Sequence, residues 1–316
     1  MALVNPTVTR DAVRARIEGE KTDVAGIVFK TLLIMALLTT LVVLVVLIVD
    51  VLVVGWDTLS TRLGSFLTGV LRAQPEDSGV FQGLRGSFWI GLFTVALAFP
   101  IGIGAAIYLE EYAPKSRFTR FIDLNIRNLA GVPSVVYGIL GFAIFVKILG
   151  DGGDGGLTGG RSLMSGGLTL AILVLPIVII TAAEAVRAVP DSIREAGFGV
   201  GATRWEVIRS HVLPYAAPGI ITGTILSLSR ALGEAAPLIL VGAVTGRLGG
   251  GQGDLLDVSQ LQERFTAMPI VITTWAGRPD AGFRTITAAA IVVLLAVVLL
   301  ANTSAILLRN HYEKKR

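Results

Sequence analysis

Six apolar runs of membrane length divide the chain, and shorter polar segments separate them. A helix that spans a bilayer needs about 20 mostly apolar residues. Six stretches meet this requirement: residues 26–54, 87–109, 121–149, 167–189, 216–245 and 284–308. The first run is rich in Leu and Val on every helical face, as expected of a helix that faces lipid. Gly, Pro, Ser and Thr interrupt the other five, which is typical of helices that pack closely together. The pattern predicts an all-α membrane protein with six transmembrane helices.

The same pattern predicts how the chain is organised around these helices. Residues 1–25 form an N-terminal segment that precedes a peripheral first helix at residues 26–54. Residues 85–308 form a core of five helices, and residues 309–316 end the chain as a basic tail. Between the fourth and fifth runs, residues 190–214 form a compact charged block with glycines at its centre. This block is the least membrane-like part of the core.

Composition supports a membrane protein and excludes several kinds of site. Hydrophobic residues make up 53% of the chain and charged residues 16%, whereas soluble domains are about 25% charged. The sequence has no cysteine, which excludes disulfides, thiolate metal sites and cysteine catalysis. The two histidines, His211 and His311, lie far apart, so we expect no histidine metal site. Basic loops explain the net charge of +4 without a nucleic-acid partner.

Basic residues are distributed unevenly between the two sides of the predicted membrane. Sixteen Lys and Arg residues fall on the side that carries both termini and the charged block, and nine fall on the other side. Cytoplasmic loops carry the excess of Lys and Arg. The sequence therefore predicts a multi-pass protein of the cell (inner) membrane with both termini and the block in the cytoplasm. The glycine-rich loops 149–160 and 246–256 then lie outside, either as plain linkers or as contacts for an external partner.

Two short helices are predicted within the charged block. Pro190 suits the start of the first helix, where its missing N–H would be unpaired anyway, and Asp191 complements the helix dipole. That helix should end in the stretch 199–201, because glycine readily adopts the left-handed conformation of a C-cap. Thr203 and Glu206 have the spacing of a capping box, so they begin the second helix.

The second helix of the block carries one apolar face. Trp205, Ile208 and Val212 recur at helical spacing, and Pro214 is expected to end the helix before the fifth membrane run. An apolar face on a projecting helix suits a docking surface for another protein. A surface helical hairpin without a partner is the alternative.

The charged block also resembles a known motif. Glu195-Ala196-Gly197, Gly201 and Leu213-Pro214 have the spacing of the EAA loop of ABC importer permeases, with departures at Gly197 and His211. In that family the loop inserts into a cleft of a separate ATPase subunit. The resemblance therefore implies an ATPase-coupling role for Glu195, Ala196, Gly197, Gly201, Ala202, Thr203, Trp205, Leu213 and Pro214.

Nucleotide must then bind to another chain. The sequence contains no G-x-x-x-x-G-K-[ST] phosphate loop, so the resemblance implies that ATP and Mg²⁺ are held by partner ATPase subunits. The sequence also lacks H-E-x-x-H, G-x-S-x-G and paired-aspartate patterns. We therefore expect no cofactor on this chain and no enzymatic activity of its own.

Charged residues inside the predicted helices mark a candidate transport path, because charge is costly within a bilayer. Arg230 lies deep in the fifth run and Glu234 follows four residues later, so both side chains would share one helix face. They form either a structural ion pair or a gated site, in which an anion competes with Glu234 for the arginine fork. Arg127, in the third run, either belongs to this path or extends toward the cytoplasmic surface.

Hydrogen-bonding residues accompany these charges. Asn128, Ser134 and Tyr137 lie in the third run, close to its arginine. Pro133 and Pro237 can interrupt their helices and free backbone groups for a ligand. The candidate path therefore combines permanent positive charge with polar groups, but these residues alone do not specify an anion.

A second resemblance narrows the cargo. The segments AGVPSVVYGILG (130–141) and SRALGEAAPLILVGA (229–243) are similar to permease subunits of phosphate-specific ABC importers, the PstA family in particular. With the charged block and the six-helix plan, the similarity covers most of residues 85–308. It implies a type I ABC importer permease fold and inorganic phosphate as cargo. It also implies a PstC-like sister permease, two PstB-like ATPase subunits and a PstS-like phosphate-binding protein.

Two other transport functions are kept as alternatives. The chain could serve another anion or small solute within an ABC importer. It could also be a secondary transporter that works alone, although such proteins are expected to show internal repeats or membrane carboxylates for ion coupling. No convincing repeat is present, and Glu234 is the only deep carboxylate.

Overall fold

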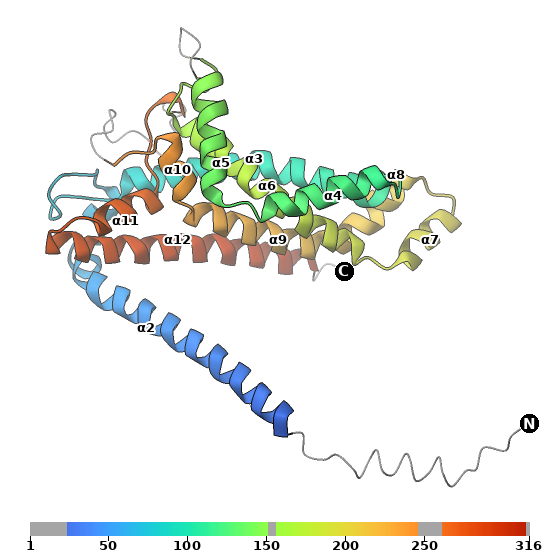
Figure 1. Ribbon diagram of the computed structural model, residues 1–316, viewed down its shortest axis with the longest axis horizontal. Helices are drawn as coiled ribbons and strands as arrows, with labels where there is room; N and C mark the ends of the chain where they lie inside the picture. Colours follow the sequence, from blue (N-terminus) through green and yellow to red (C-terminus); the bar gives the residue numbers. More distant parts are fainter. Residues whose placement is uncertain (1–23, 151–155, 246–260, 314–316) are drawn as a thin grey trace, which may run out of the picture. The chain divides into compact units, whose positions relative to one another are not determined.

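The structure is a computed structural model that describes residues 24–150, 156–245 and 261–313 (Figure 1). Every regular element within these ranges is helical, which confirms the all-α prediction. The chain divides into two compact units, Met1–Val51 and Leu52–Arg316. Most of the predicted N-terminal segment, part of the glycine-rich loop 149–160 and all of the loop 246–256 lie outside the described residues.

The first membrane helix is longer than the sequence pattern predicts. Helix α2 runs from Val24 to Thr68, and its backbone leaves the helical conformation at Arg62. In the first unit its side chains up to Asp50 are exposed on all faces. In the second unit, Gly55 lies so close to α12 that a Cβ there would be 2.8 Å from the Ala289 nitrogen. The small residue thus permits close contact between the two helices.

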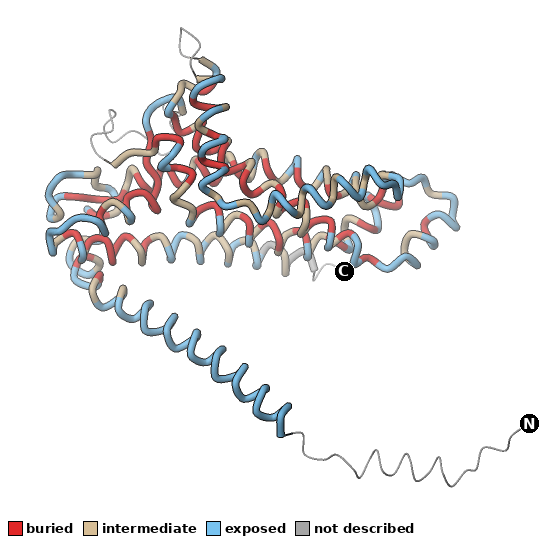
Figure 2. The backbone as a smooth tube through the Cα atoms, viewed as in Figure 1, coloured by how far each residue is buried: buried red, intermediate tan, exposed pale blue. Residues whose placement is uncertain are grey.

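Four further long helices form the body of the second unit. These are α3 (Phe81–Ile107), α6 (Leu163–Arg187), α9 (Leu213–Gly233) and α12 (Ala281–Glu313). Helix α6 lies at the centre, where 67% of its most apolar stretch is buried, against 33% for α3 and 11% for the outer helix α12 (Figure 2). Small residues bring α6 close to its neighbours, and Gly102 of α3 meets Val178. The core therefore forms around α6.

The third predicted span, residues 121–149, is not a straight helix. The structure instead has α4 (Arg117–Ala130) and α5 (Ser134–Gly141), which continues as a π-helix to Ile148. The two arms are bent by 99°, and in Figure 1 α5 turns away from the direction of α4. Pro133 explains the break, because proline supplies no N–H and disfavours helix at the residue before it. The described chain thus has five membrane-length helices, or six if the bent pair is one span.

The fifth predicted span, residues 216–245, is also broken. Helix α9 ends at Gly233 and Glu234 adopts an extended conformation. The short helix α10 (Ala236–Val241) follows, with Pro237 in its first turn. A further short helix, α11 (Met268–Ala276), is buried against α3 and α12 and was not predicted from the apolar pattern. Its length of 9 residues is too short to produce a membrane-length signal.

The contact between α5 and α10 gives a direct test of this packing. A Cβ on Gly138 of α5 would lie 2.7 Å from the backbone Cα of Pro237 in α10. We therefore expect Gly138→Ala to lower the free energy of unfolding by about 1–3 kcal/mol, because the backbone must move. Thermal unfolding of the purified protein in detergent measures this loss.

Gly104→Ala is the matched control. Gly104 lies within α3, and a Cβ there would meet nothing within 4 Å. That variant should be neutral or more stable by about 0.5–1 kcal/mol, because alanine favours helix over glycine. Equal changes of stability in Gly138→Ala and Gly104→Ala would contradict a close contact between α5 and α10.

Candidate coupling loop and transport path

The charged block folds as a short helix, a glycine turn and the start of a second helix, in the predicted order. Helix α7 (Asp191–Gly199) follows Pro190, which occupies its N-cap position. Gly201 has a φ of +84°, a conformation that favours glycine. We call residues 190–214 the coupling loop.

The capping box that begins the second helix is confirmed. The Thr203 hydroxyl accepts the Glu206 N–H at 3.4 Å, and the Thr203 N–H donates to the Glu206 carboxylate at 2.7 Å. Helix α8 (Arg204–Val207) starts from this pair. The start of the helix is therefore encoded locally.

The end of that helix was predicted wrongly. Pro214 does not stop it, because α8 continues through a π-helical turn at Ile208–Val212 into α9, giving one helix from Arg204 to Gly233. Proline has no N–H to donate, so one carbonyl of the preceding turn loses its usual partner. A local π turn can satisfy the backbone groups that are freed in this way. The predicted apolar face is also only partly correct. Ile208 and Val212 are buried, whereas Trp205 is 54% exposed.

A buried ion pair fastens the coupling loop to the membrane helices. Arg194 of α7 donates from Nη2 to Glu111 at 2.8 Å and from Nε to the same oxygen at 3.1 Å. It also donates to the carbonyls of Val189 at 2.7 Å and Val186 at 3.0 Å, at the end of α6. The two charged side chains are only 18% and 8% exposed. Arg194 therefore ties α7 to both α3 and α6.

Two further contacts join the same parts. The more exposed Arg187 donates from Nε to one Glu110 oxygen at 3.2 Å and from Nη2 to the other, and the Arg204 guanidinium lies 5.3 Å from the centre of the Tyr112 ring. Glu110, Glu111 and Tyr112 all belong to the π-helical turn that ends α3. This turn was not predicted from the sequence. Adjacent acidic residues at the end of an apolar run, opposite a basic loop, were the available signal.

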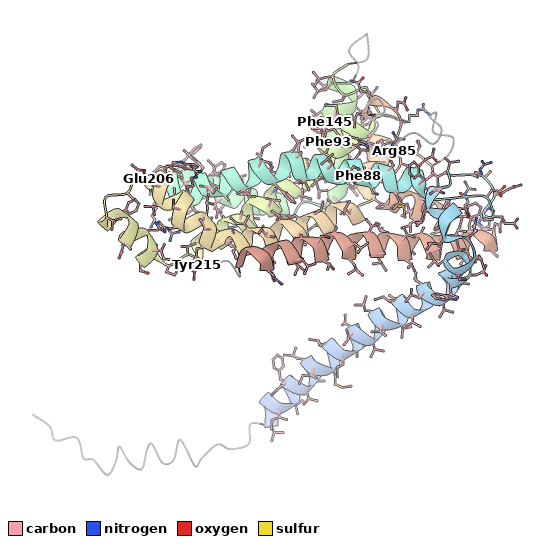
Figure 3. The ribbon with its side chains drawn as sticks, turned by 180° about the vertical axis from the view of Figure 1, so that it is seen from behind. Arg85, Phe88, Phe93, Phe145, Glu206 and Tyr215 are labelled. Atoms are coloured by element: carbon pink, nitrogen blue, oxygen red, sulfur yellow. The ribbon has the colours of Figure 1, made fainter. Side chains whose placement is uncertain are left out.

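The tip of the coupling loop is apolar and exposed. Phe198, Val200 and Trp205 are 48%, 84% and 54% exposed, and Figure 3 shows Glu206 at the same end of the second unit as Tyr215. Large exposed apolar groups that cluster on a polar loop mark a surface for a partner. The tip is therefore the candidate docking surface.

Other members of the predicted coupling set have different roles within the loop. Glu195 and Ala196 are exposed on α7, whereas Gly197 is buried. A Cβ on Gly197 would lie 2.7 Å from a methyl group of Val207. This close approach of α7 to α8 explains why glycine occupies the position where the EAA motif has its second alanine. Ala202 and Leu213 are half-buried and pack against the core beneath the loop.

The prediction that Arg230 and Glu234 share a helix face is wrong, because α9 ends at Gly233 and Glu234 lies at the break before α10. The described residues contain no ion pair between them. Arg230 is exposed in the last turn of α9 and Glu234 is half-buried. Both still flank an interruption of a membrane helix.

Arg127 is compensated by neighbouring carboxylates. It lies at the end of α4, where Nε is 3.1 Å from Asp123 and Nη1 is 3.6 Å from Glu184 of α6. Each of the three side chains is more than a third exposed. This arrangement favours a structural role for Arg127 over a free anion site.

The bend between α4 and α5 gathers the remaining polar candidates. The Asn128 carbonyl accepts the Gly131 N–H at 3.1 Å, and Ser134 begins α5. Tyr137 is buried and its hydroxyl donates to the Leu129 carbonyl at 2.9 Å. Tyr137 therefore holds the bend in shape rather than offering a free hydroxyl.

Two polar contacts beside the candidate path were not predicted from the sequence. Ser229, next to Arg230, forms a hydrogen bond with Asn302 of α12 at 2.7 Å between their side-chain oxygens. Seven residues closer to the loop, Thr222 accepts from Arg309 at 3.0 Å. The two contacts fix how α9 lies against α12. Sequence separations of 73 and 87 residues gave no local signal.

Comparison with known families identifies this combination of helices and loop. Residues 98–316 match the family described as binding-protein-dependent transport system inner membrane component. The chain belongs to that family. Within it, this inner membrane component is 32% identical to the phosphate transport system permease protein PstA 1 of Mycobacterium tuberculosis, over 91% of this chain and 88% of the relative. It is 33% identical to the probable ABC transporter permease YqgI of Bacillus subtilis, over 57% of this chain and 58% of YqgI.

Solved structures of ABC importers share the fold of this inner membrane component. A bacterial alginate ABC transporter, in complex with its periplasmic protein, matches with a TM-score of 0.63 at 13% identity, over 88% of this chain and 92% of the other. The inward-facing MetNI methionine transporter matches with a TM-score of 0.54 at 16% identity, over 74% and 94%. At such low identity these matches show the fold alone, which is that of type I ABC importer permeases.

The Arg194–Glu111 pair predicts a large effect on stability. Removing one partner of a buried ion pair leaves the other charge buried and unpaired. We expect Arg194→Ala to lower the free energy of unfolding by about 3–5 kcal/mol. Thermal unfolding of the detergent-solubilised protein, with the Glu111→Ala single and double variants, measures the coupling between the two side chains.

Arg187→Ala is the matched control. Arg187 also pairs with a glutamate of the π turn, but it is 55% exposed, so its loss should cost at most about 1 kcal/mol. Equal losses from the two variants would contradict a special role for the buried pair.

Proposed function

We propose that the chain is the membrane-spanning permease subunit of an ATP-driven importer of inorganic phosphate. It would form half of the translocation path and couple that path to a separate ATPase. Similarity to PstA 1 over nine-tenths of the chain is the main support for the cargo. The exposed apolar tip on a firmly anchored loop supports the coupling role.

The proposed assembly requires partners on both sides of the membrane. A PstC-like sister permease would complete the path, and two PstB-like ATPase subunits would bind ATP and Mg²⁺ in the cytoplasm. A PstS-like protein would deliver phosphate from outside. The distribution of Lys and Arg supports an orientation in which both termini and the coupling loop face the cytoplasm. The chain itself would hold no cofactor.

Continuous elements would transmit the motion of the ATPase to the path. The helix that starts at Arg204 runs unbroken to Gly233 and carries Arg230 near its far end. At 1.5 Å per residue, the 26 steps along the helix from Arg204 to Arg230 span about 39 Å. A displacement at the coupling loop would therefore move Arg230 directly. The Arg194–Glu111 pair would carry the same displacement to α3.

Arg230 is the residue best suited to meet an anion. Its guanidinium is exposed and forms no ion pair with any described carboxylate. A guanidinium donates a planar pair of hydrogen bonds that match two oxygens of phosphate. Glu234 lies at the α9–α10 break, where a change in the break would alter its distance from Arg230. If Glu234 moved closer to Arg230, its carboxylate would compete with the bound anion for the guanidinium, and the anion would be released.

Arg230→Gln tests the cargo and the site together. Loss of a charge-assisted hydrogen bond of about 1.5–3 kcal/mol should reduce uptake of radiolabelled phosphate at least about tenfold, with normal assembly of the complex. Uptake is measured in cells that depend on this importer. Arg120→Gln, on the exposed side of α4, is the matched control and should transport normally.

Three results would overturn parts of this assignment. Unchanged phosphate uptake in Arg230→Gln would remove Arg230 from the path. Wild-type uptake of a different anion or solute, but not phosphate, would favour the alternative cargo. Uptake by the purified chain without an ATPase would favour a stand-alone secondary transporter.

The exposed tip predicts a specific effect on ATPase binding. Buried aromatic anchors in interfaces contribute about 2 kcal/mol or more, so Trp205→Ala should raise the Kd for the ATPase subunits roughly 30-fold. Co-purification and titration of the ATPase against the permease pair measure this change. Phe118→Ala, which removes a 71% exposed aromatic residue of α4, is the control. If Trp205→Ala bound the ATPase normally, the tip would not be the docking surface.

A further inference from the structure

A buried arginine without a partner lies at the opposite end of α3 from the coupling loop. Arg85 is only 8% exposed, yet it is in the second turn of the helix. Its Nη2 is fully buried and has no hydrogen-bond partner, and the described residues contain no ion pair to it. Figure 3 shows Arg85 on α3 beside Phe88, far from Glu206 of the coupling loop.

The segment that packs beside Arg85 contains a second unpartnered group. A Cβ on Gly86 would overlap the Thr266 carbonyl oxygen at 1.7 Å, so α3 and this segment are in direct contact. The Ser87 hydroxyl accepts the Met268 N–H at 2.9 Å and fixes their register. Thr266 is 1% exposed and its hydroxyl has no partner. Thr266 thus meets the helix at Gly86, the residue next to Arg85, and both Thr266 and Arg85 have a buried side-chain atom without a partner.

The rest of this region is well satisfied, so the two groups are exceptions. The Val244 N–H donates to the Phe265 carbonyl at 3.0 Å, and the Leu163 N–H donates to the Glu263 carbonyl at 3.2 Å. These bonds hold the segment before α11 against the chain that follows α10 and against the start of α6. Loose packing therefore does not explain the unpartnered atoms of Arg85 and Thr266. The segment is fixed in place, yet the Arg85 Nη2 and the Thr266 hydroxyl have no hydrogen-bond partner.

The buried positive charge of Arg85 indicates that a ligand binds here. A guanidinium stays protonated in proteins, and burial of an unpaired charge is strongly unfavourable. The first turns of α3 add positive potential, because helix N-termini carry unpaired N–H groups and the positive end of the dipole. The region needs negative charge, and the described residues supply none that pairs with Arg85. The ligand must also be small, because Arg85 is almost closed to the surface.

We propose that Arg85 and Thr266 form a binding site for a phosphate-type oxyanion at the end of α3 opposite the coupling loop. The guanidinium would donate to two oxygens of the anion, and the Thr266 hydroxyl would donate to a third. The 22 residues from Arg85 to the end of the helix at Ile107 span about 33 Å. The site would therefore receive phosphate on entry, before Arg230. This order rests on the proposed function, whereas the anion site itself does not.

Anion-dependent thermal unfolding of the assembled importer in detergent tests the site. Without added anion, Arg85→Gln should unfold at the same temperature as the wild type or higher, because it removes an unpaired buried charge. Inorganic phosphate should raise the midpoint of the wild type and not that of Arg85→Gln. Thr266→Val keeps the charge and should weaken phosphate binding several-fold. Arg161→Gln, an exposed arginine at the start of α6, is the control and should respond like the wild type.

Further outcomes of this experiment distinguish free phosphate from a lipid headgroup as the source of the anion. They also distinguish failure of the anion site from failure of the proposed function. Loss of co-purified phospholipid from Arg85→Gln, measured by mass spectrometry, would assign the same oxyanion chemistry to a lipid headgroup. A midpoint shift with sulfate but not phosphate, abolished by Arg85→Gln, would keep the site and refute phosphate as cargo. A lower midpoint for Arg85→Gln without anion would mean that a protein carboxylate already pairs with Arg85, and would overturn the site. An equal phosphate shift in wild type and Arg85→Gln, with unchanged lipid, would overturn it too.

Discussion

The hydrocarbon core of a bilayer offers no hydrogen-bond partners, so backbone groups there must be paired within the protein or reach enclosed water. Regular helices satisfy this condition, and interruptions are tolerated only where other parts of the protein cover them. Among the described residues, two of the predicted membrane spans are interrupted in this way, at Pro133 and at Glu234. They are brought into one region because α5 packs against α10, where Gly138 meets Pro237. The polar candidates of the transport path flank these same interruptions. Irregular backbone and polar side chains are thus confined to the part of the fold that can shield both.

The coupling loop solves a different problem, which is to connect a polar surface helix rigidly to apolar membrane helices. Apolar contacts alone would let α7 slide, because they have no direction. The Arg194–Glu111 pair and the two carbonyls that Arg194 also binds give the contact a fixed geometry. The unbroken helix from Arg204 to Gly233 then links the loop to the path without a hinge. The coupling loop is thus held by the Arg194 ion pair at α7 and is continuous with the membrane helix α9 at α8.

Much of the helical content and the fold of the coupling loop could be predicted from the sequence, because the signals are local. Apolar length predicted the long helices, and Thr203 with Glu206 predicted the start of α8. Predictions failed where a residue's effect depends on distant packing. Pro133 breaks its helix, whereas Pro214 follows a π turn within a continuous helix and Pro100, Pro176 and Pro218 lie inside theirs. The spacing of Arg230 and Glu234 indicated a shared face only as long as α9 continued past Gly233. Arg194 and Glu111 are 83 residues apart, so no local pattern could pair them.

The π turn at Ile208–Val212 has a geometric consequence for the rest of α9. A π turn is in effect an α-helical turn with one inserted residue, and each residue advances an α-helix by about 100° around its axis. The insertion therefore sets the angular phase between the loop and everything that follows it. Without the extra residue, the contacts of the coupling loop would stay the same, but Ser229 would rotate away from Asn302 and Arg230 would lie on another side of the helix. The single inserted residue thus determines the direction in which Arg230 points from the axis of α9.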